Sequence, residues 1–296
     1  MEKILITGVS GFLGWNLAQT LRHHYHVYGT YLDHQIPIPA VELIAFDFTQ
    51  LDKIEKLLEV LQPQAIVHAA AFSNPDLCET QHKEALTLNT LATKQIARAA
   101  NRFGSKLIYV STDLVFDGEK GHYTEADSPA PINYYGKTKY LGELEVTNHS
   151  SYYAILRFSV LYGRGTGVAL NLFETLEQHA KRGLPMRLFT DQYRTPLFIG
   201  DAVRAVERFL CEKSLKGLFH LGGPDRMSRY EFGVRFRRVF DLTPDFTIKS
   251  TIADARLPAT RPKDCSLVSD KMIKTTGMGL TPVEQGLLLL LRTEAH

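Results

Sequence analysis

The chain opens with the stretch KILITGVSGFLG at residues 3–14, an apolar run followed by glycines at positions 8, 11 and 14. A buried strand that leads through a glycine-rich turn into a helix is the arrangement that binds the phosphates of a dinucleotide. Glycines permit the tight turn and let backbone amides and the positive end of the helix dipole meet a pyrophosphate. The alternative is a glycine-rich turn without a ligand. The combined pattern predicts a cofactor site at Gly8, Ser10, Gly11, Phe12, Leu13 and Gly14.

Short apolar runs alternate with helical patterns over the first 160 residues. The strand-like runs lie at residues 4–7, 27–31, 43–46, 65–71, 107–111 and 154–160, and the helical patterns at 13–21, 51–61, 85–101 and 135–146. This alternation is typical of a parallel sheet that is covered by helices on both faces. We therefore predict an α/β fold with a doubly wound parallel sheet of the Rossmann type.

Beyond about residue 160, glycines and prolines break the pattern into shorter pieces. We predict a dinucleotide-binding domain at 1–160 and a smaller α/β substrate-binding domain that spans mainly 161–296. The runs 197–199 and 218–221 are strand-like and are candidates to return to the first sheet, so parts of 187–221 belong with the first domain. Residues 283–291 follow Pro282 and predict a helix that faces the core.

Composition excludes several classes of protein. Lys and Arg number 34 against 32 Asp and Glu, and a net charge of +2 gives no electrostatic basis for binding nucleic acid or an anionic membrane. The aliphatic run 287–291 is too short to span a bilayer. Three scattered cysteines form no CxxC pair, and the histidines at 23, 24 and 26 are typical of a solvated segment, so we expect neither disulfides nor a metal. The sequence leaves no room for a signal peptide before residue 4, and we expect a cytoplasmic protein.

The end of the second predicted strand bears on cofactor choice. NAD-binding folds often place a carboxylate there, on the ribose 2′-hydroxyl, whereas this chain has Tyr31 and reaches Asp33 only two residues later. The missing carboxylate favours NADPH, although no Arg stands there for a 2′-phosphate, and NADH remains an alternative. Asp47 and Phe48 follow the third strand. Asp47 either accepts a hydrogen bond from the adenine amino group or caps a turn.

A second cluster of polar residues follows the predicted strand 107–111. Ser111, Thr112 and Asp113 stand at the strand end, where open α/β sheets hold their active sites. Tyr135 and Lys139 are four residues apart and share one face of the next helix. A carbonyl that accepts hydride needs a proton and hydrogen-bond donors as its oxygen gains charge. We predict that Tyr135 gives the proton, that Lys139 and an oxidised nicotinamide together shift the phenol pKa towards neutrality, and that Thr112 orients the oxygen. The alternative is a surface Tyr/Lys pair beside a strand-end turn.

These motifs resemble the extended short-chain dehydrogenase/reductases and, within them, the dTDP-4-dehydrorhamnose reductases. The resemblance rests on TGVSGFLG at 7–14, AAA at 69–71, PDLCE at 75–79, STDLVFDG at 111–118, YGKTK at 135–139, DQYRTP at 191–196 and RP at 261–262. It implies NAD(P)H-dependent reduction of the 4-keto group of a nucleotide-linked 6-deoxy sugar, dTDP-4-dehydro-L-rhamnose to dTDP-L-rhamnose, and suggests a homodimer. It adds Ala69, Ala70, Ala71 and Ser111 to the cofactor site and gives Asp113 as the acidic neighbour of Thr112.

The resemblance also implies a substrate-phosphate site. Arg194 and Arg261 stand where related sugar-nucleotide enzymes bind phosphates, and guanidinium groups suit such contacts. Either residue could instead belong to a surface ion pair. The phrase Tyr193-Arg194-Thr195 departs from the Gly/Ala-rich phrase of the rhamnose enzymes, which leaves the sugar open.

Two other functions fit the same motifs. Dehydratases of this class carry Thr-Asp-Glu, and Leu114 stands at the Glu position here, so dehydration is disfavoured while epimerisation stays open. The regulatory subunit of methionine adenosyltransferase is similar over the same phrases but reads Ser-Asn where this chain has Thr112-Asp113, which favours catalysis.

Three further residues have structural or functional interpretations. His68 lies in a predicted buried strand, where a hydrogen-bonded core role is expected. Cys78 has no base beside it in the motif, and a nucleophilic role is not supported. Asn89 either hydrogen-bonds the backbone near the site or is a solvated helix residue.

Overall fold

The computed structural model describes residues 1–168, 170–243 and 245–292. Its centre is a seven-stranded sheet in the order β11-β6-β5-β4-β1-β2-β3, in which every neighbouring pair is parallel. The strands are β1 (Lys3–Thr7), β2 (His26–Tyr31), β3 (Val41–Ala45), β4 (Ala65–His68), β5 (Lys106–Thr112), β6 (Tyr153–Phe158) and β11 (Gly217–Leu221). The strand order reverses direction between β1 and β4, which is where open parallel sheets bind ligands. The predicted doubly wound sheet is confirmed.

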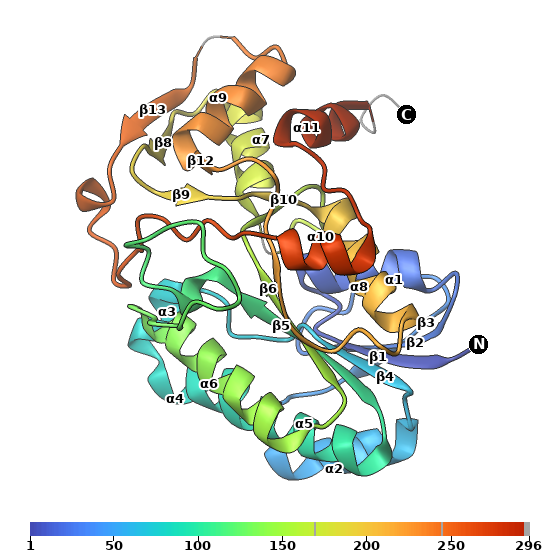
Figure 1. The fold of residues 1–296 in the computed structure, drawn as a ribbon. Helices are drawn as coiled ribbons and strands as arrows, with labels where there is room; N and C mark the ends of the chain where they lie inside the picture. The colour runs from blue at the N-terminus through green and yellow to red at the C-terminus, as the bar shows by residue number, and fades with distance from the viewer. Residues whose placement is uncertain (169, 244, 293–296) are drawn as a thin grey trace.

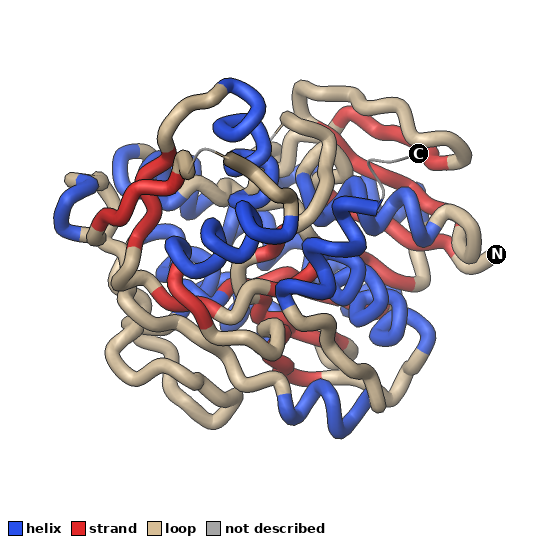
Figure 2. Tube along the Cα trace, turned by 90° about the horizontal axis from the view of Figure 1, so that it is seen from above, coloured by secondary structure: helices blue, strands red, loops and turns tan. Residues whose placement is uncertain are grey.

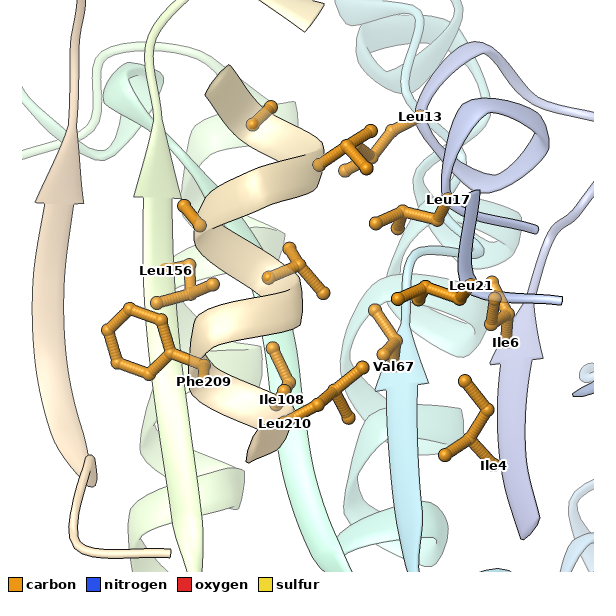
Figure 3. Packing of buried hydrophobic residues seen from close by; sticks show 14 of the residues in the cluster. Ile4, Ile6, Leu13, Leu17, Leu21, Val67, Ile108, Leu156, Phe209 and Leu210 are labelled. Carbon is orange, nitrogen blue, oxygen red and sulfur yellow. The ribbon is translucent and has the colours of Figure 1, made fainter. Parts of the chain in front are cut away.

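Helices cover both faces of this sheet (Figure 1). One face packs against α1 (Phe12–Leu21) and α8 (Ile199–Cys211), and the other against α2 (Leu51–Leu61), α5 (Ala92–Phe103) and α6 (Tyr134–His149). Successive strand side chains point to opposite faces, so Ile4 and Ile6 join the α1/α8 core while Leu5 joins the α2/α5 core. Figure 3 shows the first of these cores, with the leucines of α1 and α8 over the strands.

The predicted helix at 85–101 is interrupted. It divides into α4 (His82–Leu86), a π-helical turn η1 (Thr87–Leu91) and α5, after the short helix α3 (Pro75–Thr80). The π-helical turn brings one extra residue into the helix and rotates the side chains that follow it, and such turns are frequent at functional sites. The predicted strand at 65–71 ends at His68, which leaves Ala69, Ala70 and Ala71 in a loop at the sheet edge.

A smaller lobe lies at the top of Figure 1. It contains α7 (Leu172–Arg182), α9 (Arg229–Val239) and α11 (Val283–Arg292) beside a parallel pair of β8 (Met186–Phe189) and β13 (Thr247–Ser250), with a core of aromatic and aliphatic side chains. In Figure 2, seen from above, this strand pair lies at the left, apart from the main sheet. The face of α11 that carries Val283, Leu287 and Leu290 is buried, as predicted.

The chain crosses between the two lobes more than once. Strand β11 is the edge strand of the main sheet, beside β6, and α8 packs on the same sheet. The predicted strand 197–199 does not join that sheet: β10 (Leu197–Phe198) pairs with β7 (Leu161–Tyr162), because Ile199 already begins α8. Two antiparallel residues of β9 (Tyr193–Arg194) and β12 (Met227–Ser228) form another pair. The short helices η2 (Asp113–Val115), η3 (Ala253–Ala255) and α10 (Asp270–Thr276) complete the described elements.

Within the described ranges, no helix combines the length and the apolar character needed to cross a membrane.

Candidate active site

The glycine turn between β1 and α1 is closed so tightly that side chains would not fit. A Cβ on Gly14 would lie 2.2 Å from the carbonyl oxygen of Gly8, and Gly8 itself has φ +74° with Ala70 packed against it. The first turn of α1 therefore sits directly on the turn, with Gly11 at its N-cap position and no side chain capping it. The free amides at this helix end face an open pocket, which suits a phosphate group.

That pocket has a volume of about 670 Å³ and lies at the carboxyl edge of the main sheet. Its lining includes every residue that the sequence assigns to the cofactor, from the glycine turn to Tyr135 and Lys139, and also Thr112. The pocket is also lined by residues that the sequence analysis did not assign to it: Thr30, Leu32, Phe46, Thr49, Ser73, Leu88, Val110, Phe158, Ser159, Val160, Leu161, Val168, Leu170 and Asn171. Thr30, Val110 and Phe158 stand at strand ends and could have been found there, whereas no sequence signal marks Val168, Leu170 or Asn171.

The end of the pocket next to β2 and β3 carries little charge. Tyr31 and Asp47 line it, while Asp33 is exposed and is not part of the lining. One carboxylate oxygen of Asp47 accepts hydrogen bonds from the amide and the hydroxyl of Thr49, at 2.8 and 2.7 Å. Burial acts to raise the pKa of Asp47, but these hydrogen bonds outweigh it and leave the pKa below its ordinary value. Asp47 thus caps a turn in the structure, and an adenine contact remains a prediction.

The predicted catalytic residues converge on the other end of the pocket. Thr112 ends β5, and its hydroxyl accepts a hydrogen bond from the amide of Leu114 at 3.2 Å, which begins the turn η2. Helix α6 starts at Tyr134, where the Asn133 side chain caps the amide of Gly136 at 2.8 Å. A Cβ on Gly136 would lie 2.0 Å from the Leu114 carbonyl oxygen. This glycine lets α6 touch η2 and so places Tyr135 beside Thr112.

Two titratable groups on α6, Tyr135 and Lys139, have displaced pKa values. Burial raises the pKa of Tyr135, Asp113 and Cys78 add to the rise, and a hydrogen bond with Thr112 partly opposes it. In the chain by itself the pKa of Tyr135 therefore does not move towards neutrality as predicted, because burial outweighs the hydrogen bond with Thr112. Burial lowers the pKa of Lys139 to about 7, against the opposing effect of Glu143. Tyr135 is thus fully protonated at neutral pH, as a proton donor must be.

The side chain of Lys139 contacts an aromatic ring. Its ammonium lies 4.1 Å from the centre of the Tyr109 ring, and both residues are buried. One turn further along α6, Glu143 accepts two hydrogen bonds from Arg157, at 2.9 and 2.6 Å, and one from Ser111 at 2.5 Å. This buried network fixes Glu143 one helical turn from Lys139.

Asp113 and the two predicted phosphate-binding arginines have protein partners. Arg194 is buried, with Nε 3.3 Å from the Asp113 carboxylate and its other N–H groups on the carbonyl oxygens of Tyr193 and Pro262. Ser159 also donates to Asp113 at 3.2 Å, and Asp113 is not part of the pocket lining. Burial raises the pKa of Asp113 although Arg194 opposes the rise. Arg261 bonds to Asp76 at 2.6 Å and to the Ala259 carbonyl at 2.9 Å.

The remaining residues singled out in the sequence support the pocket walls. His68 is buried between the hydroxyls of Thr7 and Thr93, at 2.8 and 3.1 Å, and burial lowers its pKa to about 3, which confirms the core interpretation. Asn89, in the π-helical turn, accepts from the Phe72 amide at 2.8 Å and donates to the Phe72 carbonyl at 3.1 Å, so the backbone role is confirmed. Burial raises the pKa of the Cys78 thiol to about 11.

No group of three or more His, Cys, Asp or Glu side chains within residues 1–168, 170–243 and 245–292 is arranged to hold a metal ion.

A doubly wound sheet, a glycine turn after its first strand and a Tyr/Lys pair one helical turn apart beside a strand-end Thr define the extended short-chain dehydrogenase/reductase class. The comparison with protein families is more specific. The chain belongs to the RmlD substrate binding domain family, whose model matches residues 1–295.

Individual relatives include both enzymes and a subunit of an enzyme. The chain is 33% identical to methionine adenosyltransferase 2 subunit beta of Mus musculus, over 97% of this chain and 86% of that protein. It is 32% identical to a probable low-salt glycan biosynthesis reductase of Haloferax volcanii, with 87% of each chain covered.

Solved structures of reductases match nearly the whole chain. A dTDP-4-dehydrorhamnose reductase from Bacillus anthracis in complex with NADP superposes with a TM-score of 0.88 at 26% identity, over 99% of both chains. A dTDP-4-dehydrorhamnose reductase from Clostridium acetobutylicum gives 0.85 at 30% identity, over 99% of this chain and 100% of that one. The fold and family are therefore those of sugar-nucleotide reductases.

Proposed function

We propose that this chain is an NAD(P)H-dependent reductase of the 4-keto group of a nucleotide-linked 6-deoxy sugar, with dTDP-4-dehydro-L-rhamnose as substrate and dTDP-L-rhamnose as product. The observation that carries the proposal is that Thr112, Tyr135 and Lys139 line the same pocket as the glycine turn. The reductase relatives described above support it. The departure at Tyr193-Arg194-Thr195 is the reason that the sugar needs a direct test.

The pocket residues fit a nicotinamide dinucleotide. The amides of the Gly8–Gly14 turn would hold its diphosphate, and Tyr31, Asp47 and Phe48 would border its adenosine, while Ala69, Ala70, Ala71 and Ser111 lie between the two ends. When bound, the reduced cofactor supplies a hydride to the sugar carbon. We propose a preference for NADPH over NADH because no carboxylate stands at the end of β2 to bind the ribose 2′-hydroxyl.

The chain's own residues supply the proton and the charge. Tyr135 donates its phenolic proton to the carbonyl oxygen as the carbon gains the hydride, and solvent later replaces that proton. Thr112 holds the oxygen, and Lys139 stabilises the phenolate that Tyr135 becomes. Asp113 is buried and bonded to Thr112 at 3.3 Å, so we propose that it positions that hydroxyl. Arg194 and Arg261 supply positive charge on the substrate side.

We further propose that residues 1–160, with returning segments from 187–221, hold the cofactor, that 161–296 mainly bind the substrate, and that the protein is a cytoplasmic homodimer. Residues 169, 244 and 293–296 of the second range lie outside the described residues.

A second candidate function is that of a regulatory subunit, and the relationship to the mouse methionine adenosyltransferase subunit favours it. This chain carries Thr112 and Asp113 at the strand end, which the catalytic reading requires. Co-purification with a synthetase would support the regulatory reading. A nucleotide-sugar epimerase uses the same Tyr and Lys, and is recognised by release of an isomerised sugar without net cofactor oxidation.

The deciding experiment follows the absorbance of NADPH and of NADH while the purified protein is offered freshly generated dTDP-4-dehydro-L-rhamnose. We expect stoichiometric oxidation, faster with NADPH, and formation of dTDP-L-rhamnose. Tight cofactor binding without oxidation would contradict the reductase proposal and favour the regulatory subunit.

A further inference from the structure

A third arginine stands beside the two that the sequence singles out. Strand β9 pairs with β12 so that Arg194 lies opposite Met227 and Tyr193 opposite Ser228. The ladder continues by one residue, because the amide of Arg229 donates to the carbonyl of Gln192 at 3.2 Å. Side chains two residues apart share one face of a strand, so Arg194 and Gln192 lie on one face and Arg229 meets them there. A hydrogen bond from Nε of Arg229 to the Gln192 side chain shows this contact directly.

The three guanidinium groups differ in what they already bind. Arg194 forms an ion pair with Asp113 and donates hydrogen bonds to two backbone carbonyls, and Arg261 forms an ion pair with Asp76. Arg229 makes no ion pair with any described residue, and Gln192 is the one hydrogen-bond partner of its side chain among residues 1–168, 170–243 and 245–292. Its two Nη atoms therefore keep their donor capacity, and the residue is only partly buried.

Arg229 is also close to the charges of the other two arginines. Burial, followed by the charges of Arg194 and Arg261, lowers the pKa of Arg229 to about 10, while Asp113 opposes the shift. It remains protonated at neutral pH. Three guanidinium groups thus share a region in which the two carboxylates, Asp113 and Asp76, are already paired, and an anion there would relieve their mutual repulsion.

Two carboxylates connect the cluster to the neighbourhood of the proposed catalytic residues. Asp113 joins Arg194 to Thr112. Asp76 joins Arg261 to α3, and Glu79 of the same helix accepts a hydrogen bond from the amide of Tyr134, the neighbour of Tyr135, at 2.7 Å. A group bound to the arginines would therefore lie next to a sugar whose carbonyl faces Tyr135.

We propose that Arg229 binds the diphosphate of a nucleoside diphosphate through its two Nη groups, and that Arg194 and Arg261 surround this contact with fixed positive charge. This inference rests on the proposed function for the identity of the ligand. Guanidinium groups bind phosphate oxygens in pairs, which Lys cannot reproduce. Arg229 is thus the direct diphosphate ligand, and the two arginines that are paired with carboxylates are positioning residues.

The test measures the binding of dTDP and of thymidine by titration calorimetry, in the presence of saturating NADPH. The variants are Arg229→Gln, Arg229→Lys and Arg238→Gln, a control that removes the same charge from an exposed site on the same helix. We expect Arg229→Gln to weaken dTDP binding about 10- to 100-fold, as loss of a charged hydrogen-bond pair does, with Arg229→Lys intermediate and Arg238→Gln unchanged. Thymidine, which lacks phosphate, should bind equally weakly to all four proteins.

Three results would overturn the inference: wild-type affinity for dTDP in Arg229→Gln, an equal loss in Arg238→Gln, or a wild-type protein that binds dTDP no better than thymidine. Circular dichroism shows whether each variant is folded. If Arg229→Gln does not fold, Arg229→Lys still tests the inference. The proposed function can fail separately. Phosphate-selective binding of dTDP without oxidation of NADPH would refute the proposed reductase activity but leave the role of Arg229 intact. Reduction of the sugar with an unchanged KM in Arg229→Gln would support the reductase activity but refute the role of Arg229.

Discussion

The two ends of the active site present positive potential to phosphates in different ways. At the proposed cofactor end, the turn from Gly8 to Gly14 offers backbone amides and a helix dipole, and Lys139, beyond Tyr135 on α6, is the one cationic side chain in the described lining of the pocket. At the proposed substrate end, Arg194, Arg229 and Arg261 offer full charges, and Arg194 and Arg261 are paired with the carboxylates of Asp113 and Asp76. The first arrangement depends on the absence of side chains, and the second on side chains that three distant segments bring together.

The difference affects cost and specificity. Backbone amides at a helix end carry a partial charge of about half a unit and require no desolvation of an ion. A guanidinium group carries a whole charge, and removing it from water is costly unless it is paired. Arg194, which is buried, lies against Asp113, and Arg261, which is partly buried, lies against Asp76. We infer that the glycine turn provides a rigid, general phosphate site, whereas the arginine cluster can be tuned to one substrate.

The largest expected effect lies between the two ends. Tyr135→Phe removes the proton donor but leaves both phosphate sites intact. We expect kcat to fall by about 10²- to 10⁴-fold, the usual contribution of a general acid, while the Kd for NADPH changes less than about threefold. Stopped-flow turnover and fluorescence titration of NADPH measure the two quantities. Near-wild-type turnover would remove Tyr135 from the mechanism.

A side chain at Gly14 is expected to disrupt the proposed cofactor site most directly. A Cβ there would lie 2.2 Å from the Gly8 carbonyl oxygen, and neither backbone segment can move without opening the turn. We expect Gly14→Ala to weaken NADPH binding by about 10- to 100-fold, equivalent to the loss of one or two charged hydrogen bonds. Gly279→Ala is the matched control, because that glycine has open space around it and no positive φ. Binding of dTDP should be unchanged in both variants, and a parallel loss would show that the two ends are not independent.

The same contrast explains which parts of the site could be predicted from the sequence. Local spacing sets the glycine turn and the Tyr135/Lys139 pair, so both were found, and the residues assigned to the cofactor all line the pocket. Arg229 was missed because its position depends on the pairing of β9 with β12, which no local pattern encodes. Asn171 was also missed, because it lies between β7 and α7 and reaches the pocket only through the tertiary fold.

Two errors in the fold have equally specific causes. The run 197–199 is apolar enough for a strand, yet Ile199 begins α8, since the helical pattern from 199 to 211 continues an amphipathic face that packs on the main sheet. The helical pattern at 85–101 was continuous in the sequence. The π-helical turn within it lets Asn89 bond to the Phe72 backbone, a tertiary requirement that overrides the regular period.

A smaller effect is expected where the catalytic ammonium is held. The Tyr109 ring stabilises the charged form of Lys139, whose pKa of about 7 already reflects burial opposed by Glu143. Of the other titratable groups in this region, His68 is neutral above a pKa of about 3 and Tyr135 stays a phenol. Tyr109→Leu therefore lowers the pKa of Lys139, and we expect the alkaline fall of kcat to begin about one pH unit lower, the equivalent of a buried cation–π contact.

Tyr109→Phe is the control for that experiment. It keeps the ring but loses the weak hydrogen bonds from the hydroxyl to the carbonyls of Asn89 and Lys139, at 3.4 and 3.3 Å. Its pH profile should match that of the wild type even if its melting temperature falls. Equal displacement of the alkaline limb in Leu and Phe variants would show that packing, and not the ring's charge distribution, sets the profile.

The smallest effect compares the two phosphate sites without any mutation. Raising the salt concentration from about 0.05 M to about 0.5 M shortens the Debye length from roughly 14 to roughly 4 Å, which weakens attraction to full charges more than to a helix end in contact with its ligand. With NADH as cofactor, both ligands carry one diphosphate, and the comparison is free of the 2′-phosphate. We expect the KM for the nucleotide sugar to rise several-fold and that for NADH about twofold or less. In Arg229→Gln the salt dependence of the KM for the nucleotide sugar should become as weak as that for NADH. Equal salt dependence of the two KM values in the wild type would mean that the arginine cluster contributes no net field at the substrate. The two ends of the site would then differ in shape alone.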